Sequence, residues 1–314
     1  MQIKDDIRGC VAFIGVETEE GIRMRGTAFF VHIETANGFF VYLVTAKHNI
    51  VLARRTVKKD AAPVILARIN AKTGGFKYLM IPFAAWADHP DPTVDVTAAL
   101  LLPTALMAFD FRAIQDNILA TEEVRNKEII GIGDEVFLIG LFASHYGRQR
   151  NVPVLRMGTI ACMPEEQVDT VAYGPMDAYI VETRSIGGLS GSPVFVFLDG
   201  ERVHRTEDGT PARDMMRSDR IILLGMMHGH WDAPLNLAPE IVADALGTEE
   251  GRINMGMAIV IPSEKIRETL DQPALADFRR VTDNAIAASR RSDGGSATNA
   301  NSGSPASSGP ASTS

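Results

Sequence analysis

Apolar residues occur along the first part of this chain in short runs, separated by segments that contain Gly, Asn, Asp or Pro. The runs are rich in Val, Ile, Phe and Leu, and they lie at Val11–Val16, Thr27–Ile33, Phe39–Thr45, Val64–Ile69, Tyr78–Phe83 and Val96–Leu102. This pattern is typical of strands in an antiparallel sandwich or barrel. Asn37-Gly38, between two of the runs, predicts a tight hairpin because this pair tolerates the positive φ of such a turn.

The second part of the chain repeats this character after an intervening stretch. Residues from Ala105 to Asn126 form a mixed, polar segment that predicts a helical or irregular connection. Strand-like runs then resume at Glu135–Phe142, Val154–Cys162, Ala178–Glu182, Pro193–Leu198, Ile221–Met227 and Met255–Ile261. About six strands on each side of the connection predict an all-β fold of two small antiparallel barrels in tandem.

The C-terminal region predicts helices followed by a tail. Ser263 is expected to cap a helix over Glu264–Leu270, and a second helix is expected over Leu275–Ala288. From Ser292 onward nothing apolar is larger than Ala, so the segment cannot offset its ordering entropy. The expected organisation is an N-terminal barrel with the connection in 1–126, a second barrel with the C-terminal helix in 127–288, and a disordered Ser/Gly/Ala/Pro tail in 289–314.

Composition and charge narrow the classes of protein. The 314 residues include 31 Lys+Arg and 39 Asp+Glu, which gives a formal net charge of −8, and they contain no basic block. We therefore expect no nucleic acid and no membrane as the main partner. No stretch predicts a membrane span or a secretory signal, and a cytoplasmic location is expected. Two cysteines, Cys10 and Cys162, exclude a disulfide-dense scaffold; free buried thiols are favoured, with a single bridge as the alternative.

Three segments carry candidate chemistry, and each has an ordinary interpretation when it is taken alone. His48 closes an apolar strand, where a histidine is more often structural than catalytic. Asp95 precedes the apolar run at Val96, as a strand-entry aspartate would. Ser190 lies in a Gly/Ser-rich segment that would also suit a plain loop. Glycines beside a serine, however, let the backbone turn sharply and aim N–H groups at one point, as an acyl-transfer nucleophile requires.

Taken together, these residues follow the order His, Asp, Ser, with spacings of 47 and 95 residues. This order and the glycines around Ser190 resemble the trypsin-like (chymotrypsin-fold) serine peptidases, in particular bacterial-type members without a PDZ domain. The resemblance covers roughly Cys10 to Ile266 and includes three supporting segments, Gly133–Gly140, Ile222–Gly229 and Met255–Pro262. It implies two six-stranded barrels with the site in the cleft between them, and no cofactor.

The resemblance also implies a role for each residue. Ser190 would be the nucleophile of a serine endopeptidase that acts on a protein or peptide through an acyl-enzyme intermediate. His48 would be the general base and then the acid, and Asp95 would hold the imidazole tautomer. The N–H groups of Gly188 and Ser190 match the oxyanion-hole positions. Leu189 stands where activation-type zymogens carry an aspartate, so activation by a newly cut N-terminus is not expected.

Specificity is predicted from positions near the implied substrate pocket. Arg184 matches the base of that pocket, and His228, Gly229 and His230 match the strand that lines it. A cationic pocket of this kind would prefer an acidic residue before the scissile bond; a solvated or salt-bridged Arg184 is the alternative. The two histidines alone do not make a metal site, because zinc normally takes three or four protein ligands and no third is evident.

Two other functions compete with the endopeptidase hypothesis. The chain could be a catalytically silent peptidase-fold module that binds a partner protein, although such a module has no physical need for His48, Asp95 and Ser190 together. An esterase-like hydrolase on another fold is opposed by the strand-rich pattern. A cytoplasmic protease also needs restraint, so the charged stretch His204–Arg220 is a candidate regulatory loop, with a regulatory protein partner as one way to control it.

Overall fold

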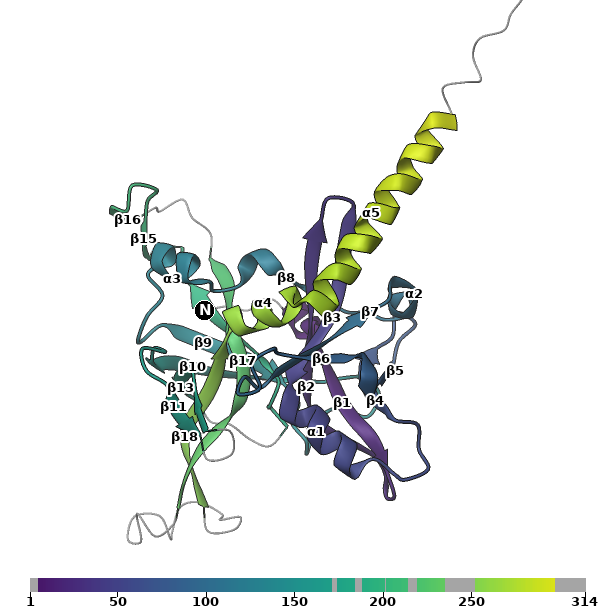
Figure 1. Cartoon of the computed structure of the whole chain (residues 1–314). Coiled ribbons are helices and arrows are strands. Elements are labelled where there is room, and N and C mark those ends of the chain that lie inside the picture. The colour runs from purple at the N-terminus through teal and green to yellow at the C-terminus, as the bar shows by residue number, and fades with distance from the viewer. Residues whose placement is uncertain are drawn as a thin grey trace, which may run out of the picture.

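The computed structural model describes residues 5–170, 174–183, 188–200, 202–213, 219–234 and 252–296. Strands dominate these residues and form two bodies that lie beside each other, the first purple to blue and the second teal to green in Figure 1. The all-β, two-body architecture predicted from the apolar runs is therefore confirmed. The candidate residues His48, Asp95 and Ser190 come from both bodies.

The first body is a curled, eight-stranded sheet with the order β5-β4-β1-β2-β3-β7-β6, to which β8 adds beside β2. Its strands are β1 Val11–Thr18, β2 Gly21–Thr35, β3 Gly38–Ala46, β4 Val64–Asn70, β5 Phe76–Pro82, β6 Trp86–Asp88, β7 Val96–Leu101 and β8 Ile114–Gln115. Six strands were expected here, and each of the six predicted runs is a strand. The short β6 and β8 are additional, and they lack the long apolar runs that mark the others.

The second body is a closed, six-stranded barrel with the order β10-β13-β18-β17-β14-β9. Its strands are β9 Glu135–Gly140, β10 Val154–Cys162, β13 Tyr179–Glu182, β14 Pro193–Leu198, β17 Arg220–Pro234 and β18 Arg252–Pro262. Two small hairpins accompany it, formed by β11 Val168–Thr170 with β12 Gly174–Met176 and by β15 Val203–Arg205 with β16 Pro211–Arg213. The strand number predicted for this barrel is confirmed.

Helices connect and cover the two bodies. The α-helices are α1 Lys47–Thr56, α2 Pro103–Leu106, α3 Glu122–Glu128, α4 Ser263–Asp271 and α5 Pro273–Ser296, and the 3₁₀ turns are η1 Asp5–Cys10, η2 Phe83–Ala85 and η3 Asp116–Ile118. Helix α4 contacts β7 of the first sheet and β17 of the barrel, so it bridges the two bodies. Among the described helices, none combines the length and the apolar character needed to span a membrane.

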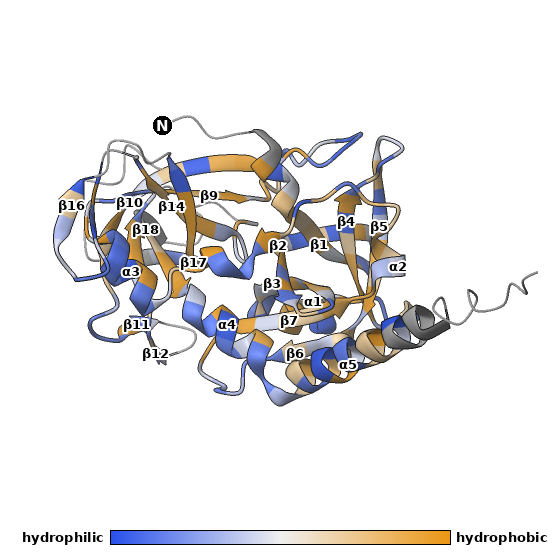
Figure 2. Cartoon of the chain, turned by 90° about the horizontal axis from the view of Figure 1, so that it is seen from above, coloured by the Kyte–Doolittle hydropathy of each residue, from blue (hydrophilic) through white to orange (hydrophobic). Residues whose placement is uncertain are grey.

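The apolar runs are nearly continuous in the central strands, such as β1, β3, β7, β9 and β14, because these strands bury both faces. In β1, Phe13 packs into the core between the two bodies, while its neighbours Ala12 and Ile14 pack inside the first sheet. In β9, Phe137 packs into the central core and Leu138 into the barrel interior. Successive side chains point to opposite faces of a strand, so both faces here require apolar residues. Figure 2 shows hydrophobic residues concentrated in the strands and hydrophilic ones in the connecting loops.

Several local expectations are corrected. Ser263 is the first residue of α4, and its buried Oγ has no hydrogen-bond partner, so it does not cap the helix. Both cysteines are free, but Cys162 is exposed and only Cys10 is buried. Helix α5 runs to Ser296, past its predicted end at Ala288. Residues 297–314 of the predicted tail lie outside the described residues.

Candidate active site

His48 is placed by the junction between β3 and α1. Strand β3 ends at Ala46, which pairs with Val96 of β7, so the residue before Val96 lies beside the residues that follow Ala46. Helix α1 begins at Lys47, whose Nζ donates to the carbonyl groups of Pro92 and Val94 and so ties down the segment that leads to Asp95. The sheet register thus brings His48 and Asp95 together although they are 47 residues apart.

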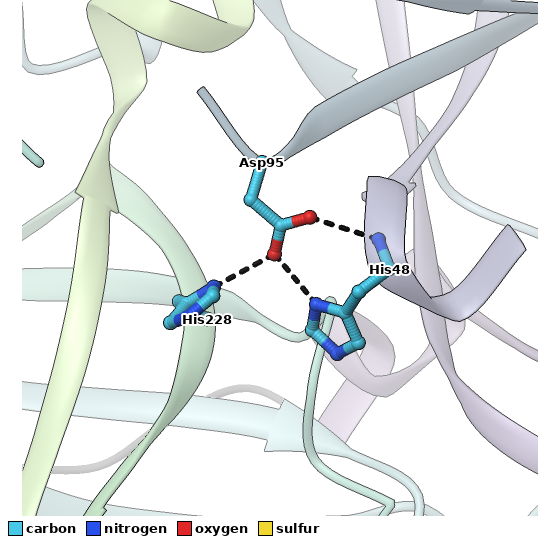
Figure 3. A group of neighbouring side chains, drawn as sticks. All are labelled: His48, Asp95 and His228. Atoms are coloured by element: carbon cyan, nitrogen blue, oxygen red, sulfur yellow. Dashed lines mark hydrogen bonds and ion pairs between the residues drawn. The ribbon is translucent and has the colours of Figure 1, made fainter. Parts of the chain in front are cut away.

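Asp95 is fully buried and accepts three hydrogen bonds through its two carboxylate oxygens (Figure 3). Its Oδ1 accepts from the backbone N–H of His48 at 2.8 Å. Its Oδ2 accepts from Nδ1 of His48 at 2.6 Å and from Nδ1 of His228 at 2.7 Å. Burial raises the pKa of Asp95, but the hydrogen bonds from His228 and His48 outweigh it and hold the pKa at about 2.

An ionised carboxylate fixes the protons on both imidazoles. At neutral pH Asp95 has no proton to give, so Nδ1 of His48 and Nδ1 of His228 must both be the donors. His48 then presents an unprotonated Nε2, which lies 2.6 Å from Oγ of Ser190. This is the tautomer in which a histidine can take a proton from a serine hydroxyl.

Ser190 lies in the loop that leads into β14, and buried polar groups of the first body hold that loop. The carbonyl oxygen of Ser190 accepts from the backbone N–H of Thr27 at 3.0 Å and from Nδ2 of Asn49 at 3.1 Å. Oγ1 of Thr27 donates to the carbonyl oxygen of Gly188 at 3.0 Å. Asn49 also donates to Oγ1 of Thr45 at 3.1 Å, and Thr45 donates to the carbonyl oxygen of Thr27 at 2.7 Å.

The glycine after Ser190 is required by both space and backbone angle. Gly191 has a φ of +83°, which side chains rarely adopt, and a Cβ there would lie 2.1 Å from the carbonyl oxygen of Thr27. The close approach of the two bodies at this point therefore depends on Gly191. In consequence, the loop places Ser190 in contact with Asn49, the residue after His48.

The two predicted oxyanion-hole donors lie on either side of Leu189. Within the described part of the chain, neither the N–H of Gly188 nor that of Ser190 donates to another protein group, so both remain free to bind a substrate oxygen. Gly188 has a φ of +98°. Leu189 is buried in the barrel core, so an apolar contact anchors this loop.

The residues predicted to line the substrate pocket differ in burial and contacts. His228 is buried on β17 and turns Nδ1 to Asp95. Gly229 lies beside space that the described residues leave open, since a Cβ at this position would meet none of their atoms within 4 Å. His230 is partly buried on the same strand. Arg184 lies outside the described residues.

The ligand atoms of His48, Asp95 and His228 lie within 4.8 Å of one another, a grouping that a metal ion also uses. The two N···O distances of 2.6 and 2.7 Å are those of charge-assisted hydrogen bonds. Ligands that sit about 2 Å from a tetrahedral ion are separated by roughly 3.3 Å. The observed distances therefore fit N–H donors on His48 and His228 that both bind Oδ2 of Asp95 better than they fit ligands of a metal ion.

The structure brings the predicted residues His48, Asp95 and Ser190 together, and the groups that hold them were not predicted. Thr27, Thr45 and Asn49 are buried polar residues next to apolar runs. Their position beside those runs was the only available signal, because their partners are far away in the sequence.

Several solved structures of protease domains are similar to this chain. It is similar to the MamO protease domain from Magnetospirillum magneticum, at 13% identity and a TM-score of 0.46, covering 84% of this chain and 97% of that chain. It is also similar to the Rv3671c protease in an inactive form, at 14% identity and a TM-score of 0.42, covering 85% of this chain and 89% of that chain.

A third similar structure is the HtrA-type protease AlgW with a decapeptide, at 13% identity and a TM-score of 0.43. That match covers 85% of this chain and 65% of the AlgW chain. No protein-family model matches the sequence, and neither does any curated protein. With TM-scores below 0.5 and identities of 13–14%, these matches carry no conclusion about activity.

Proposed function

We propose that this protein is a serine endopeptidase that cleaves peptide bonds through an acyl-enzyme intermediate. The observation that carries the proposal is the continuous chain of hydrogen bonds from Ser190 Oγ to His48 Nε2 and from His48 Nδ1 to Asp95 Oδ2, both 2.6 Å long. The three residues come from distant parts of the sequence. A module without catalytic activity would not need them at these distances.

The geometry supports a defined sequence of proton transfers. Oγ of Ser190 attacks the peptide carbonyl carbon while its proton passes to Nε2 of His48, and the carbonyl oxygen becomes an oxyanion. The N–H groups of Gly188 and Ser190 stabilise that oxyanion. When the C–N bond breaks, His48 gives the proton to the leaving amine. Water then repeats the cycle on the acyl-enzyme and releases Ser190.

A fluorescent fluorophosphonate tests for an activated nucleophile without knowledge of the substrate. We expect wild-type protein to be labelled, the Ser190→Ala variant to remain unlabelled, and the Ser144→Ala variant, which loses an exposed serine, to be labelled like wild type. Absence of labelling in folded wild-type protein would overturn the proposal and favour a silent module that binds a partner protein.

The substrate preference is the finer part of the proposal. We assign to Arg184 and His230 a preference for an acidic residue before the scissile bond, with Gly229 leaving room for the substrate. Digestion of a peptide library should then enrich Glu or Asp at that position, and the Arg184→Ala variant should lose the enrichment. A library digest without acidic enrichment would reject this assignment while leaving the peptidase activity intact.

Control of the activity is assigned to the stretch His204–Arg220. Its described part contains the β15–β16 hairpin, which projects from the barrel beside α3 (Figure 1). Replacing this stretch by a short Gly/Ser linker should change the labelling rate if the stretch restrains the site or receives a regulatory protein. An unchanged rate, alone and in the presence of cell extract, would exclude it as a regulatory element.

A further inference from the structure

The buried carboxylate of the triad is held by two imidazoles instead of one. Oδ2 of Asp95 accepts from Nδ1 of His48 at 2.6 Å and from Nδ1 of His228 at 2.7 Å (Figure 3). We propose that His228 is a positioning residue of the proposed peptidase, which fixes the Asp95 carboxylate so that Asp95 can orient His48. This inference rests on the proposed function and gives His228 a role other than substrate binding.

The donors to Asp95 show why a second residue is needed. His48 supplies two of the three hydrogen bonds, one from its backbone N–H and one from Nδ1. In the described part of the chain, His228 is the only donor to this carboxylate besides His48. Without His228, Asp95 would be oriented only by the residue that it must itself orient.

The position of His228 is linked to the nucleophile through the backbone. Met227, the residue before it, accepts from the N–H of Gly191 and donates to the carbonyl oxygen of Ser192, both at 2.8 Å. Strand β17 thus pairs with the two residues that follow Ser190 and one residue later reaches Asp95. His228 therefore joins the loop of the nucleophile to the carboxylate of the opposite body.

Contact between the rings limits the movement of His48 as well. The imidazoles of His48 and His228 pack edge to face, with centroids 5.5 Å apart and planes at 85°. His228 is 8% exposed, and burial of an ionised carboxylate beside it is tolerable only when the carboxylate is fully hydrogen-bonded. The donor at Nδ1 is thus the chemical feature of His228 that the site uses.

Two substitutions separate this donor from the rest of the side chain. In asparagine, Nδ2 is bonded to Cγ as Nδ1 is in histidine, so His228→Asn keeps an N–H at the same place. His228→Leu keeps a similar bulk and removes the donor. A misplacement of reacting groups by about 1 Å can lower turnover by about 10²-fold. We therefore expect His228→Leu to reduce kcat by about 10²-fold with KM within about twofold of wild type. His228→Asn should restore most of the loss.

Three outcomes would overturn the assignment. Equal losses in the Asn and Leu variants would mean that the ring is needed for packing only. A change confined to KM, or an altered preference at the residue before the scissile bond, would make His228 a substrate contact. Thermal unfolding of both variants distinguishes these results from a failure to fold.

A spectroscopic measurement tests the geometry independently of activity. In protein labelled with ¹⁵N-histidine, we expect two strongly deshielded Nδ1–H proton signals, one from each imidazole on Asp95. His228→Asn should remove one of them, and Ser190→Ala should retain both. A single such signal in wild type would overturn the inference even in an active enzyme. Two signals in a protein that fluorophosphonate does not label would instead refute the proposed function and leave the placement of His228 intact.

Discussion

Asp95 is isolated from water, and each of its oxygens accepts a hydrogen bond from His48. Replacement by asparagine would put an amide N–H₂ where an acceptor is needed, and His48 would be driven to the tautomer with its proton on Nε2. We therefore expect Asp95→Asn to lower kcat/KM by about 10⁴-fold, as loss of the correct tautomer does in a Ser-His-Asp triad. Steady-state kinetics on a peptide substrate measure the effect, and a loss below about tenfold would contradict the assigned role.

The low pKa of Asp95 also predicts a pH dependence of stability. Its folded-state pKa of about 2 lies below the ordinary value of 3.8, so the ionised carboxylate stabilises the folded protein at and above mildly acidic pH. The ionised Asp95 contributes about 2 kcal/mol to the free energy of unfolding, and this contribution is lost as the pH falls from roughly 4 through 2. Urea unfolding over this range should show a steeper fall in wild type than in Asp95→Asn; parallel curves would contradict the prediction.

Asn49 should affect the placement of Ser190 through the backbone of its loop. Its buried amide joins Thr45 to the carbonyl oxygen of Ser190. Removal of the amide in Asn49→Ala should loosen the Ser190 loop and lower the rate of fluorophosphonate labelling by about tenfold or more, because small misplacements of reacting groups are costly. Leu52→Ala, an exposed change on the same helix, is the matched control. Equal rates for the two variants would show that the amide has no positioning role.

The sequence predicts only part of the candidate site, because some of its residues act through partners that are distant in the chain. His48, Asp95 and Ser190 are found because they lie in short segments with a recognisable local pattern. The roles of Asn49 and His228 depend on partners 141 and 133 residues away, and nothing beside them in the sequence identifies those partners. Such roles arise only when the two bodies are packed together.

At the scale of elements, the predicted hairpin is confirmed but its predicted turn is not. Thr35 pairs with Gly38, so the turn consists of Ala36 and Asn37. Neither Asn37 nor Gly38 has the positive φ on which the prediction was based. Asn37 instead uses its side chain to bind helix α5, since Nδ2 donates to Oδ2 of Asp283 at 2.9 Å. Strands were predicted well because two buried faces produce apolar runs, whereas α1, which begins immediately after a strand, was missed.

Helix α5 should loosen when its contact with this hairpin is removed. Oδ1 of Asp283 accepts from Oγ1 of Thr35 at 2.7 Å and from the backbone N–H of Asn37 at 3.1 Å. These hydrogen bonds lower the pKa of Asp283. We expect Asp283→Ala to speed amide hydrogen exchange in the C-terminal half of α5 severalfold with unchanged fluorophosphonate labelling. Asp277→Ala, which removes an exposed pairing with Arg280, is the control; equal exchange in both variants would contradict the prediction.

At the scale of the molecule, the proposed chemistry requires the two bodies to keep their relative position. His48 on α1 and Asp95 before β7 lie on the first body, whereas Ser190 before β14 and His228 on β17 lie on the barrel. A shared apolar core joins the bodies and includes the stacked rings of Phe137 and Phe195, whose centroids are 5.1 Å apart. The catalytic distances therefore depend on contacts remote from the site.

Arg68 connects the two bodies through polar contacts away from the site. It lies on β4, is 2% exposed, and donates to Oδ1 of Asn151 at 2.8 Å and to the carbonyl oxygens of Gly147 at 2.8 Å and Tyr146 at 3.2 Å. All three acceptors precede β10 of the barrel. The guanidinium also lies 3.7 Å from the centroid of the Phe76 ring. One side chain of the first body thus satisfies several acceptors in the loop that joins β9 and β10 of the barrel.

Replacement of this arginine should weaken stability and activity together. Arg68→Met fills similar space but leaves buried acceptors without donors, so we expect unfolding to become easier by about 3 kcal/mol. Because the bodies then hold each other less firmly, fluorophosphonate labelling of Ser190 should decline at a lower temperature than in wild type, before global unfolding seen by far-UV circular dichroism. Arg55→Met, at an exposed position, should change neither property. If Arg68→Met lowered stability while labelling followed global unfolding as in wild type, Arg68 would stabilise the fold without maintaining the alignment of Ser190 with His48.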